Sequence, residues 1–319
     1  MRNVLVTGAS GFVGGRLVRA LMERLPAGTP LVAWGHQPDF DLMTLGAQWQ
    51  KVEITDPAAV DASIGDIRPR LVFHLAALSS VGQSHEAGAE TYASNLLGTN
   101  NIARSLVSHV PDAALVFAST GEVYGSAFLG GAVTETSPMR PLNPYARSKL
   151  ACEFVLQDML AQTCPVIALR LLNHTGPGQD ERFVVPSFAA QVARIEAGHM
   201  PPTLSVGNLS AERDFLDVDD VIDAYVKTLD LVGSAPGFRV FNVASGHPRS
   251  IASIVERLRV QSRLPFNVEQ DPARMRAADI ATTLSDASSF RAATGWAPRR
   301  DFDDTIARVL DHWREQVRR

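Results

Sequence analysis

A glycine-rich segment near the N-terminus constrains the fold of this chain more than any other feature. Residues 7–14 read Thr-Gly-Ala-Ser-Gly-Phe-Val-Gly, directly after the strand-like run 3–7, and they open an amphipathic helical pattern. A strand, a glycine turn and a helix in this order form the phosphate-binding start of a βαβ unit. Gly8 permits the tight turn, Gly11 lets the backbone approach a diphosphate, and Gly14 lets the helix pack closely. The helix N-terminus would supply amide donors to the phosphates, although an ordinary turn can also require glycine.

Short apolar strands alternate with longer helical patterns through the first half of the chain. Residues 71–75 and 114–118 are continuous apolar runs, typical of strands that are buried on both faces of a parallel sheet. The alternation predicts an α/β fold built on a Rossmann-like, doubly wound parallel sheet. The expected strands cover 3–7, 31–34, 50–54, 71–75, 114–118 and 166–170, and the expected helices 11–25, 91–110 and 143–162.

After residue 171 the pattern changes. Residues 173–182 are rich in glycine, proline and polar residues, which predicts a loop, and 204–215 is irregular and charged. We expect helices at 183–197, 219–231, 250–260 and 302–317, and a further sheet strand at 238–243. The predicted dinucleotide-binding domain covers 1–170, and the chain returns to it over about 215–245. A smaller C-terminal α/β substrate domain takes 171–214 and 246–319.

The composition argues against several classes of partner. The net charge is −4 and no basic block is present, so we expect no nucleic-acid partner. No apolar run approaches the roughly 20 residues that span a bilayer, and no signal peptide fits before the first strand. Cys152 and Cys164 lack metal or disulfide spacing and the histidines form no His-x-x-x-His pair, so we expect no metal site. These features predict a cytoplasmic protein without a membrane partner.

Tyr145 and Lys149 carry the main chemical signal. They are four residues apart, so on a helix they share one face. A lysine ammonium beside a phenol favours the phenolate and lets the tyrosine exchange a proton near neutral pH. Thr120, after the apolar run 114–118, can hydrogen-bond the oxygen on the carbon that is reduced or oxidised. Together with the glycine segment, these residues predict a hydride-transfer enzyme. Glu122 is either an acid/base for a sugar proton or a loop carboxylate.

The second strand gives the signal for cofactor choice. It ends at Trp34-Gly35-His36, with no carboxylate to bind a ribose and no arginine to bind a phosphate. His36 could approach a 2′-phosphate, so we expect NADP(H) or NAD(H), with NADP(H) slightly favoured. Glu53 and Ile54 could contact the adenine, or Glu53 could be a surface acid at a helix start.

In combination, these motifs resemble the extended branch of the short-chain dehydrogenase/reductases over essentially the whole chain. The resemblance also rests on His-Leu-Ala-Ala at 74–77, Asn-x-x-Gly-Thr at 95–99 and Thr-Gly-Trp-x-Pro at 294–298. Within the branch, residues 173–179 and 206–215 are most similar to the GDP-4-keto-6-deoxymannose reductases and, less closely, to the GDP-mannose 4,6-dehydratases.

The resemblance implies roles for individual residues. Tyr145 would protonate the C4 oxygen of the sugar, Lys149 would hold the nicotinamide ribose, and Thr120 would bind the C4 oxygen, with Glu122 as a further catalytic candidate. The expected cofactor site comprises Gly8, Ser10, Gly11, Phe12, Val13, Gly14, His36, Glu53, Ile54, Leu75, Ala76, Ala77, Asn95, Tyr145, Lys149, Leu172 and His174. The expected nucleotide-sugar site comprises Ser79, Ser80, Glu122, Asn173, Val184, Arg213, Arg276 and Asp279.

Three of the substrate residues have a plain alternative. Arg213 suits a phosphate because a guanidinium offers a planar fork of donors, but it could instead pair with Asp214 or Glu212. Asp279 suits a ribose, yet both it and Arg276 could lie on a solvated surface.

The resemblance implies NAD(P)H-dependent reduction of the 4-keto group of a GDP-4-keto-6-deoxyhexose, giving a GDP-rhamnose-type product. Many related dehydratases place two carboxylates after the threonine, whereas Gly121 here leaves Glu122 alone. The alternatives are a GDP-mannose 4,6-dehydratase or a 4-epimerase of the same family. A cofactor-sensing regulatory protein would not need the Tyr-Lys pair. The resemblance also implies a homodimer whose four-helix seam uses residues 91–110 and 143–162.

Overall fold

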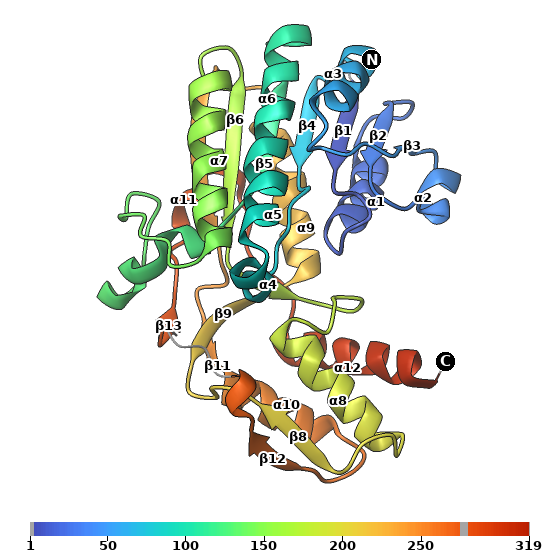
Figure 1. The fold of residues 1–319 in the computed structure, drawn as a ribbon, viewed down its shortest axis with the longest axis vertical. Helices are drawn as coiled ribbons and strands as arrows, with labels where there is room; N and C mark the ends of the chain where they lie inside the picture. Colours follow the sequence, from blue (N-terminus) through green and yellow to red (C-terminus); the bar gives the residue numbers. More distant parts are fainter. Residues whose placement is uncertain (1–2, 275–279, 319) are drawn as a thin grey trace.

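A seven-stranded parallel sheet forms the centre of the computed structural model, which describes residues 3–274 and 280–318 (Figure 1). Its strand order is β10-β6-β5-β4-β1-β2-β3, and every neighbouring pair is parallel. The order reverses between β1 and β4, the kind of switch point at which open α/β sheets bind ligands. The strands are β1 Val4–Thr7, β2 Leu31–Trp34, β3 Gln48–Gln50, β4 Leu71–His74, β5 Ala114–Thr120, β6 Pro165–Leu171 and β10 Gly237–Val243.

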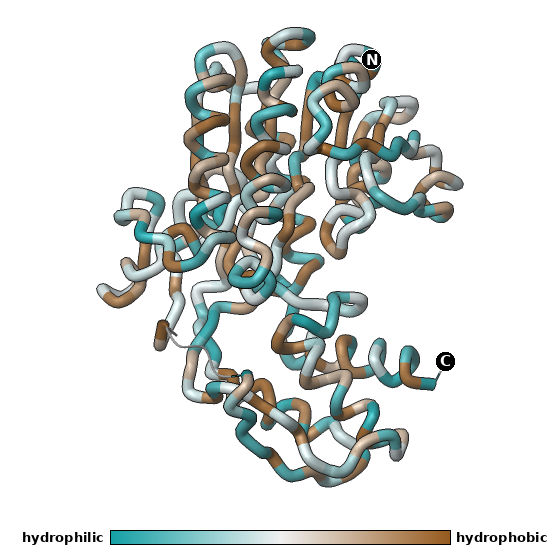
Figure 2. The backbone as a smooth tube through the Cα atoms, in the orientation of Figure 1, coloured by the Kyte–Doolittle hydropathy of each residue, from teal (hydrophilic) through white to brown (hydrophobic). Residues whose placement is uncertain are grey.

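Helices cover both faces of this sheet, and each face has its own hydrophobic core. Successive strand residues point to opposite faces. Val4 and Val6 therefore belong to one core, shared with α1 (Gly14–Arg24) and α9 (Val218–Lys227). Leu5 belongs to the other, shared with α3 (Pro57–Ile67), α6 (Gly98–His109) and α7 (Pro144–Leu160). Figure 2 shows the matching pattern along the helices, where hydrophobic and hydrophilic residues alternate from turn to turn.

The C-terminal elements gather below the carboxyl ends of the large sheet (Figure 1). Helices α8 (Val184–Glu196), α10 (Ile251–Gln261) and α12 (Phe302–Arg318) enclose a third core. A four-stranded sheet joins β7 Asn173–Thr175, β9 Glu212–Asp217, β11 Pro248–Ser250 and β13 Thr282–Thr283, and a separate pair joins β8 Thr203–Val206 to β12 Asn267–Gln270. β10 returns to the large sheet beside β6, as the sequence predicted for a strand near 238–243.

Three regions differ from the sequence-based expectation. β3 lies before residue 51 instead of over 50–54. The helix expected at 91–110 is divided into α5 (Gly88–Tyr92), a π-helical turn (Ala93–Leu97) and α6. Segment 204–215 was expected to be irregular, but it contains most of β8 and β9. β9 is a strand because it pairs with β7, β11 and β13, all distant in sequence. The expected loop at 173–182 begins as β7.

The remaining elements are short and were not expected. They are α2 (Phe40–Thr44), α4 (Val81–Glu86), α11 (Ser288–Thr294) and the 3₁₀ turns Gly121–Gly130, Thr228–Asp230 and Pro272–Arg274. Among the described residues, no helix is long and apolar enough to cross a membrane. The same residues contain no group of three or more His, Cys, Asp or Glu side chains suited to a metal ion.

Candidate active site

A cavity of about 1160 Å³ opens at the carboxyl ends of the large sheet's strands. Its wall combines the glycine segment, the ends of β2, β4 and β5, the start of α7 and residues of the C-terminal elements. Pockets that enclose one drug-sized ligand usually measure about 300–1,000 Å³. The cavity is therefore larger than the usual pocket for a single ligand.

The glycine segment forms the first part of the wall. Gly8 has a φ of 73°, and a Cβ atom there would lie 2.7 Å from the backbone nitrogen of Ala76. A Cβ atom at Gly14 would lie 2.1 Å from the carbonyl oxygen of Gly8, so this glycine is needed by the turn itself. No side chain caps the N-terminus of α1. Its amides can therefore serve a phosphate.

The other predicted cofactor residues line the cavity with one exception. Ser10, Phe12, Val13, His36, Glu53, Ile54, Leu75, Ala76, Ala77, Leu172 and His174 all contribute to the wall. The backbone nitrogen of His36 donates to Ser10 Oγ at 3.2 Å, which joins the end of β2 to the glycine segment. Glu53 Oε1 accepts from the backbone nitrogen and the hydroxyl of Thr55 and so stabilises the local turn.

Asn95 is the exception to this placement. The side chain is buried in the π-helical turn and does not line the cavity. Its Oδ1 accepts from the backbone nitrogen of Leu78 at 2.8 Å, and its Nδ2 donates to Leu78 O and Ser148 Oγ. Asn95 therefore fixes the segment that follows β4 against α7, one layer behind the cavity wall.

Tyr145 and Lys149 lie one turn apart near the start of α7, and both line the cavity. Asn143 caps this helix, since its Oδ1 accepts from the backbone nitrogen of Ala146 at 2.8 Å. Lys149 Nζ donates to the carbonyl oxygen of Ala118 at 2.7 Å and lies 4.6 Å from the ring centre of Phe117. Burial lowers the pKa of Lys149 from 10.5 to about 8.

The predicted lowering of the Tyr145 pKa by Lys149 is wrong for this structure. Burial raises the pKa of Tyr145 well above its usual value, a hydrogen bond with the side chain of Thr120 acts in the opposite direction, and the charge of Glu122 raises the pKa further. The Lys149 ammonium is directed instead at the carbonyl of Ala118. Tyr145 is therefore a neutral phenol near pH 7, which is the form that donates a proton.

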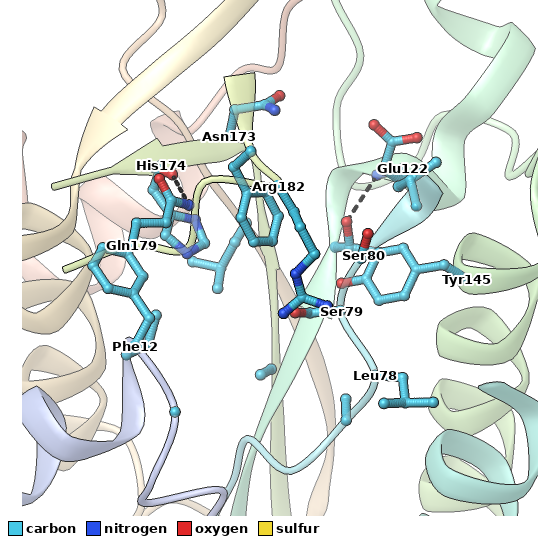
Figure 3. Close-up of a pocket in the computed structure, with 18 of the residues that line it drawn as sticks. Phe12, Leu78, Ser79, Ser80, Glu122, Tyr145, Asn173, His174, Gln179 and Arg182 are labelled. Atoms are coloured by element: carbon cyan, nitrogen blue, oxygen red, sulfur yellow. Dashed lines mark hydrogen bonds between the residues drawn. The ribbon is translucent and has the colours of Figure 1, made fainter. Parts of the chain in front are cut away.

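Thr120 and Glu122 approach Tyr145 from the end of β5. Thr120 is the last residue of that strand, and its Oγ1 accepts from the backbone nitrogen of Glu122 at 3.2 Å. Figure 3 shows Glu122 and Tyr145 on one side of the cavity, with Phe12 and His174 on the other. Glu122 Oε2 also accepts from Asn143 Nδ2 at 3.2 Å, which fixes the carboxylate beside the cap of α7.

The residues predicted to bind substrate belong to the wall of the same cavity, as far as they are described. Ser79, Ser80, Asn173, Val184 and Arg213 all line the cavity. Arg213 Nη1 donates to the carbonyl oxygens of Glu212 and Ile280 at 2.8 and 2.7 Å. Those bonds orient the guanidinium in the cavity wall. Arg276 and Asp279 lie outside the described residues.

Several cavity residues were not singled out from the sequence. They include Gln179, Arg182, Ser187, Asn208 and Arg274. All of them lie in segments whose sequence indicates only a loop, an irregular stretch or a helix start. Their shared wall forms only when the C-terminal elements fold back beneath the large sheet, so the local pattern assigned none of them a role, although segments 173–179 and 206–215 carry part of the family resemblance.

Comparison with known proteins gives a consistent result. The sequence pattern of the family described as GDP-mannose 4,6 dehydratase matches residues 5–309. The GDP-6-deoxy-D-mannose reductase of Pseudomonas aeruginosa is 33% identical over 99% of both chains. The UDP-glucose 4-epimerase of Bacillus subtilis is 25% identical over 98% of this chain and 96% of its own.

Solved structures agree with these similarities. RMD from Pseudomonas aeruginosa complexed with NADPH superposes with a TM-score of 0.83 at 31% identity, covering 99% of this chain and 100% of that one. MoeE5 in complex with UDP-glucose and NAD superposes with a TM-score of 0.85 at 26% identity, covering 99% of each chain.

Proposed function

The chain belongs to the GDP-mannose 4,6 dehydratase family of extended short-chain dehydrogenase/reductases, and from this premise we propose that it reduces the 4-keto group of a GDP-4-keto-6-deoxyhexose. The electron donor is NADPH or NADH, and the product is of the GDP-rhamnose type. The 33% identity to a GDP-6-deoxy-D-mannose reductase over nearly the whole chain supports this substrate class.

The observation that carries the proposal is that Tyr145, Lys149 and Thr120 line one cavity together with the glycine segment. The bound dihydronicotinamide supplies a hydride to C4. Tyr145 would donate a proton to the C4 oxygen, Thr120 would hold that oxygen, and Lys149 would bind the nicotinamide ribose. A phenol with a raised pKa suits reduction, because the tyrosine begins the reaction protonated.

The surroundings of Tyr145 favour a reductase over the other two activities considered, 4-epimerase and 4,6-dehydratase. A 4-epimerase must first oxidise a C4 hydroxyl and so needs a tyrosine that accepts a proton. A 4,6-dehydratase needs both a base for C5 and an acid for the C6 hydroxyl. Glu122 is the carboxylate whose charge acts on Tyr145, and Gly121 precedes it where many dehydratases carry a second one.

The proposal extends to the organisation of the protein. Residues 1–170, with the return over about 215–245, would hold the cofactor, and residues 171–214 and 246–319 would hold the nucleotide sugar. The proposed enzyme is a homodimer joined through the helices at 91–110 and 143–162. It would work in the cytoplasm, where both NADPH and nucleotide sugars are supplied.

The test supplies GDP-4-keto-6-deoxymannose with NADPH or NADH, and follows cofactor oxidation by absorbance and product configuration by NMR. We expect stoichiometric oxidation, with NADPH preferred because Gly35 and His36, and no carboxylate, stand directly after β2, where a carboxylate would repel a 2′-phosphate. Absence of oxidation with either donor would contradict the proposal. Conversion of GDP-mannose with no net cofactor change would identify a dehydratase, and interconversion of C4 epimers by retained cofactor would identify an epimerase.

Tyr145→Phe should lower kcat by about 10²–10⁴-fold, because the variant lacks the proton donor. The affinity for NADPH should stay close to that of the wild type. Tyr92→Phe is the matched control, since Tyr92 is 37% exposed and lies outside the cavity wall. Equal kcat values for Tyr145→Phe and the wild type would remove Tyr145 from the mechanism.

A further inference from the structure

Arg182 crosses the mouth of the active-site cavity. It belongs to the loop between β7 and α8, and its side chain points into the cavity between Phe12 and His174 on one side and Tyr145 on the other (Figure 3). The sequence offered no reason to select it. Its position between the glycine segment and the catalytic tyrosine places a permanent cation where two ligands would meet.

The contacts of Arg182 join two walls of the cavity. Its Nε donates to Asp180 Oδ1 at 2.8 Å within its own loop. Its Nη1 donates to Gln83 Oε1 at 2.5 Å, and Gln83 lies in α4, on the wall that follows β4. The Oγ atom of Ser80, a residue of the cavity wall, accepts from the backbone nitrogen of Gln83 at 3.3 Å.

These contacts orient Arg182 but are weak enough to exchange. The side chains of Arg182 and Asp180 are 52% and 49% exposed. Ion pairs with this exposure usually contribute about 0–1 kcal/mol. Gln83 offers only a neutral amide oxygen, whereas a phosphate offers anionic oxygens that a guanidinium can bind through two parallel hydrogen bonds. The Nη2 amino group makes no hydrogen bond to the part of the chain that the structure describes.

We propose that Arg182 is a diphosphate clamp, which exchanges Gln83 for the diphosphate of the bound nucleotide sugar and draws the loop at 176–182 over it. Arg213 lines the same cavity, so its wall carries a second guanidinium group besides that of Arg182. The cofactor also carries a diphosphate, but the uncapped amides of α1 serve that one. The inference rests on the proposed function in one respect, namely that the second ligand is a nucleotide sugar.

The test measures GDP binding by calorimetry to protein saturated with NADP⁺. Arg182→Gln keeps a polar side chain of similar length and removes the charge, and we expect it to weaken GDP binding at least about tenfold. Guanosine binding and NADPH binding should change by less than twofold. Arg182→Lys, which keeps the charge but not the fork, should fall between. Arg194→Gln is the matched control, because Arg194 pairs with Glu181 of the same loop but lies outside the cavity wall.

Gln83→Ala distinguishes a diphosphate clamp from a latch, by which we mean a purely structural contact between Arg182 and Gln83. A clamp predicts that removing Gln83 leaves GDP binding unchanged or tighter, because the guanidinium loses a competitor. A latch predicts that Gln83→Ala and Arg182→Gln weaken binding equally, and that result would overturn the proposal. A GDP affinity within twofold of wild type in Arg182→Gln, or an equal loss of NADPH and GDP affinity, would overturn it as well.

Failure of the proposed function would be recognised separately. If the wild type binds UDP or dTDP in place of GDP, the same variants are compared with that nucleotide, since the diphosphate is common to all three. A wild type that binds GDP without reducing the keto sugar would contradict the reductase assignment. The variants would then still decide whether Arg182 binds the diphosphate.

Discussion

At the scale of single residues, two enclosed groups set the chemistry of the site: the phenol of Tyr145 and the ammonium of Lys149. They share a helix face, yet each is tuned by different neighbours. The phenol responds to burial, to the hydrogen bond from Thr120 and to the charge of Glu122. The ammonium responds to its own burial and is held by the carbonyl of Ala118. Lys149 is therefore a fixed cation one helix turn from the tyrosine, and we propose that it binds the ribose hydroxyls of the cofactor.

Lys149 gives a pH prediction with a definite sign. Burial disfavours the charged form, so the ammonium is present below a pKa of about 8 and is lost as the pH rises through that value. We expect kcat/KM for NADPH to fall with an inflection near pH 8, because this parameter reports the pKa values of the free enzyme.

Lys149→Arg tests the assignment of that inflection. Arginine stays protonated over the whole accessible range, so the variant should show no loss of kcat/KM around pH 8. An inflection that persists unchanged in Lys149→Arg would belong to another group.

At the scale of elements, a buried polar network holds the active-site strand and helix together. Glu153 of α7 accepts two hydrogen bonds from Arg170 of β6, at 3.0 and 2.6 Å, and one from Ser119 of β5 at 2.5 Å. Arg170 also donates to the hydroxyl of Tyr124, which donates to Asn242 of β10. Ser119 directly precedes Thr120, and Glu153 lies one turn after Lys149. The network therefore fixes the end of β5, with Thr120, relative to Tyr145 and Lys149 on α7.

Breaking the buried ion pair between Arg170 and Glu153 should lower the stability of the folded protein. Both side chains are 4% exposed, and removing one partner of a buried ion pair usually destabilises a protein by about 3–5 kcal/mol. We expect Arg170→Met to lower the free energy of unfolding by that amount in urea titrations, because it leaves the Glu153 carboxylate buried without its cation. The double variant Arg170→Met/Glu153→Leu should recover most of the loss.

A surface pair serves as the control for this experiment. Arg70 and Asp112 form an ion pair with side chains 44% and 55% exposed. Arg70→Met should therefore change the free energy of unfolding by less than about 1 kcal/mol. Similar losses for Arg70→Met and Arg170→Met would show that burial does not govern the strength of the Arg170 pair.

At the scale of the whole molecule, one side of the large sheet presents apolar side chains to solvent. Tyr92 of α5, Leu97 of the π-helical turn and Phe154 of α7 are 37%, 54% and 50% exposed. The three elements pack against one another. Such exposure on neighbouring helices fits the proposed dimer seam, since a second copy would remove these side chains from water.

Phe154→Glu should convert the proposed dimer to a monomer, because the seam would then bury an unpaired carboxylate. Light scattering after size-exclusion chromatography should report the mass of two chains for the wild type and of one for the variant. Phe40→Glu is the control, since Phe40 is 73% exposed on α2, away from these helices, and should leave the mass unchanged. A wild type with the mass of one chain would contradict the dimer.

Much of the large sheet was predictable because its signals are local. β1, β2, β5 and β6 were expected within two residues of their observed bounds, since each is a short apolar run. β9 was not predicted from the sequence, because its polar residues form a strand only by pairing with three segments that are distant in the sequence. The same reason explains the break in the helix expected at 91–110, where Asn95 bonds to Leu78 and Ser148.

The sequence by itself determined the parts of the site whose chemistry lies in neighbouring residues: the glycine turn, the Tyr145–Lys149 spacing and the hydroxyl of Thr120. Spacing along one helix or one turn follows from residues that are close in the sequence, so it can be predicted without the tertiary structure. The tertiary structure alone decided which group each side chain meets. It directed Lys149 to Ala118, moved Asn95 behind the wall and brought Arg182 to Gln83, 99 residues earlier in the chain. Contacts of that kind, and the burial that shifts a pKa, exist only once distant segments have packed together.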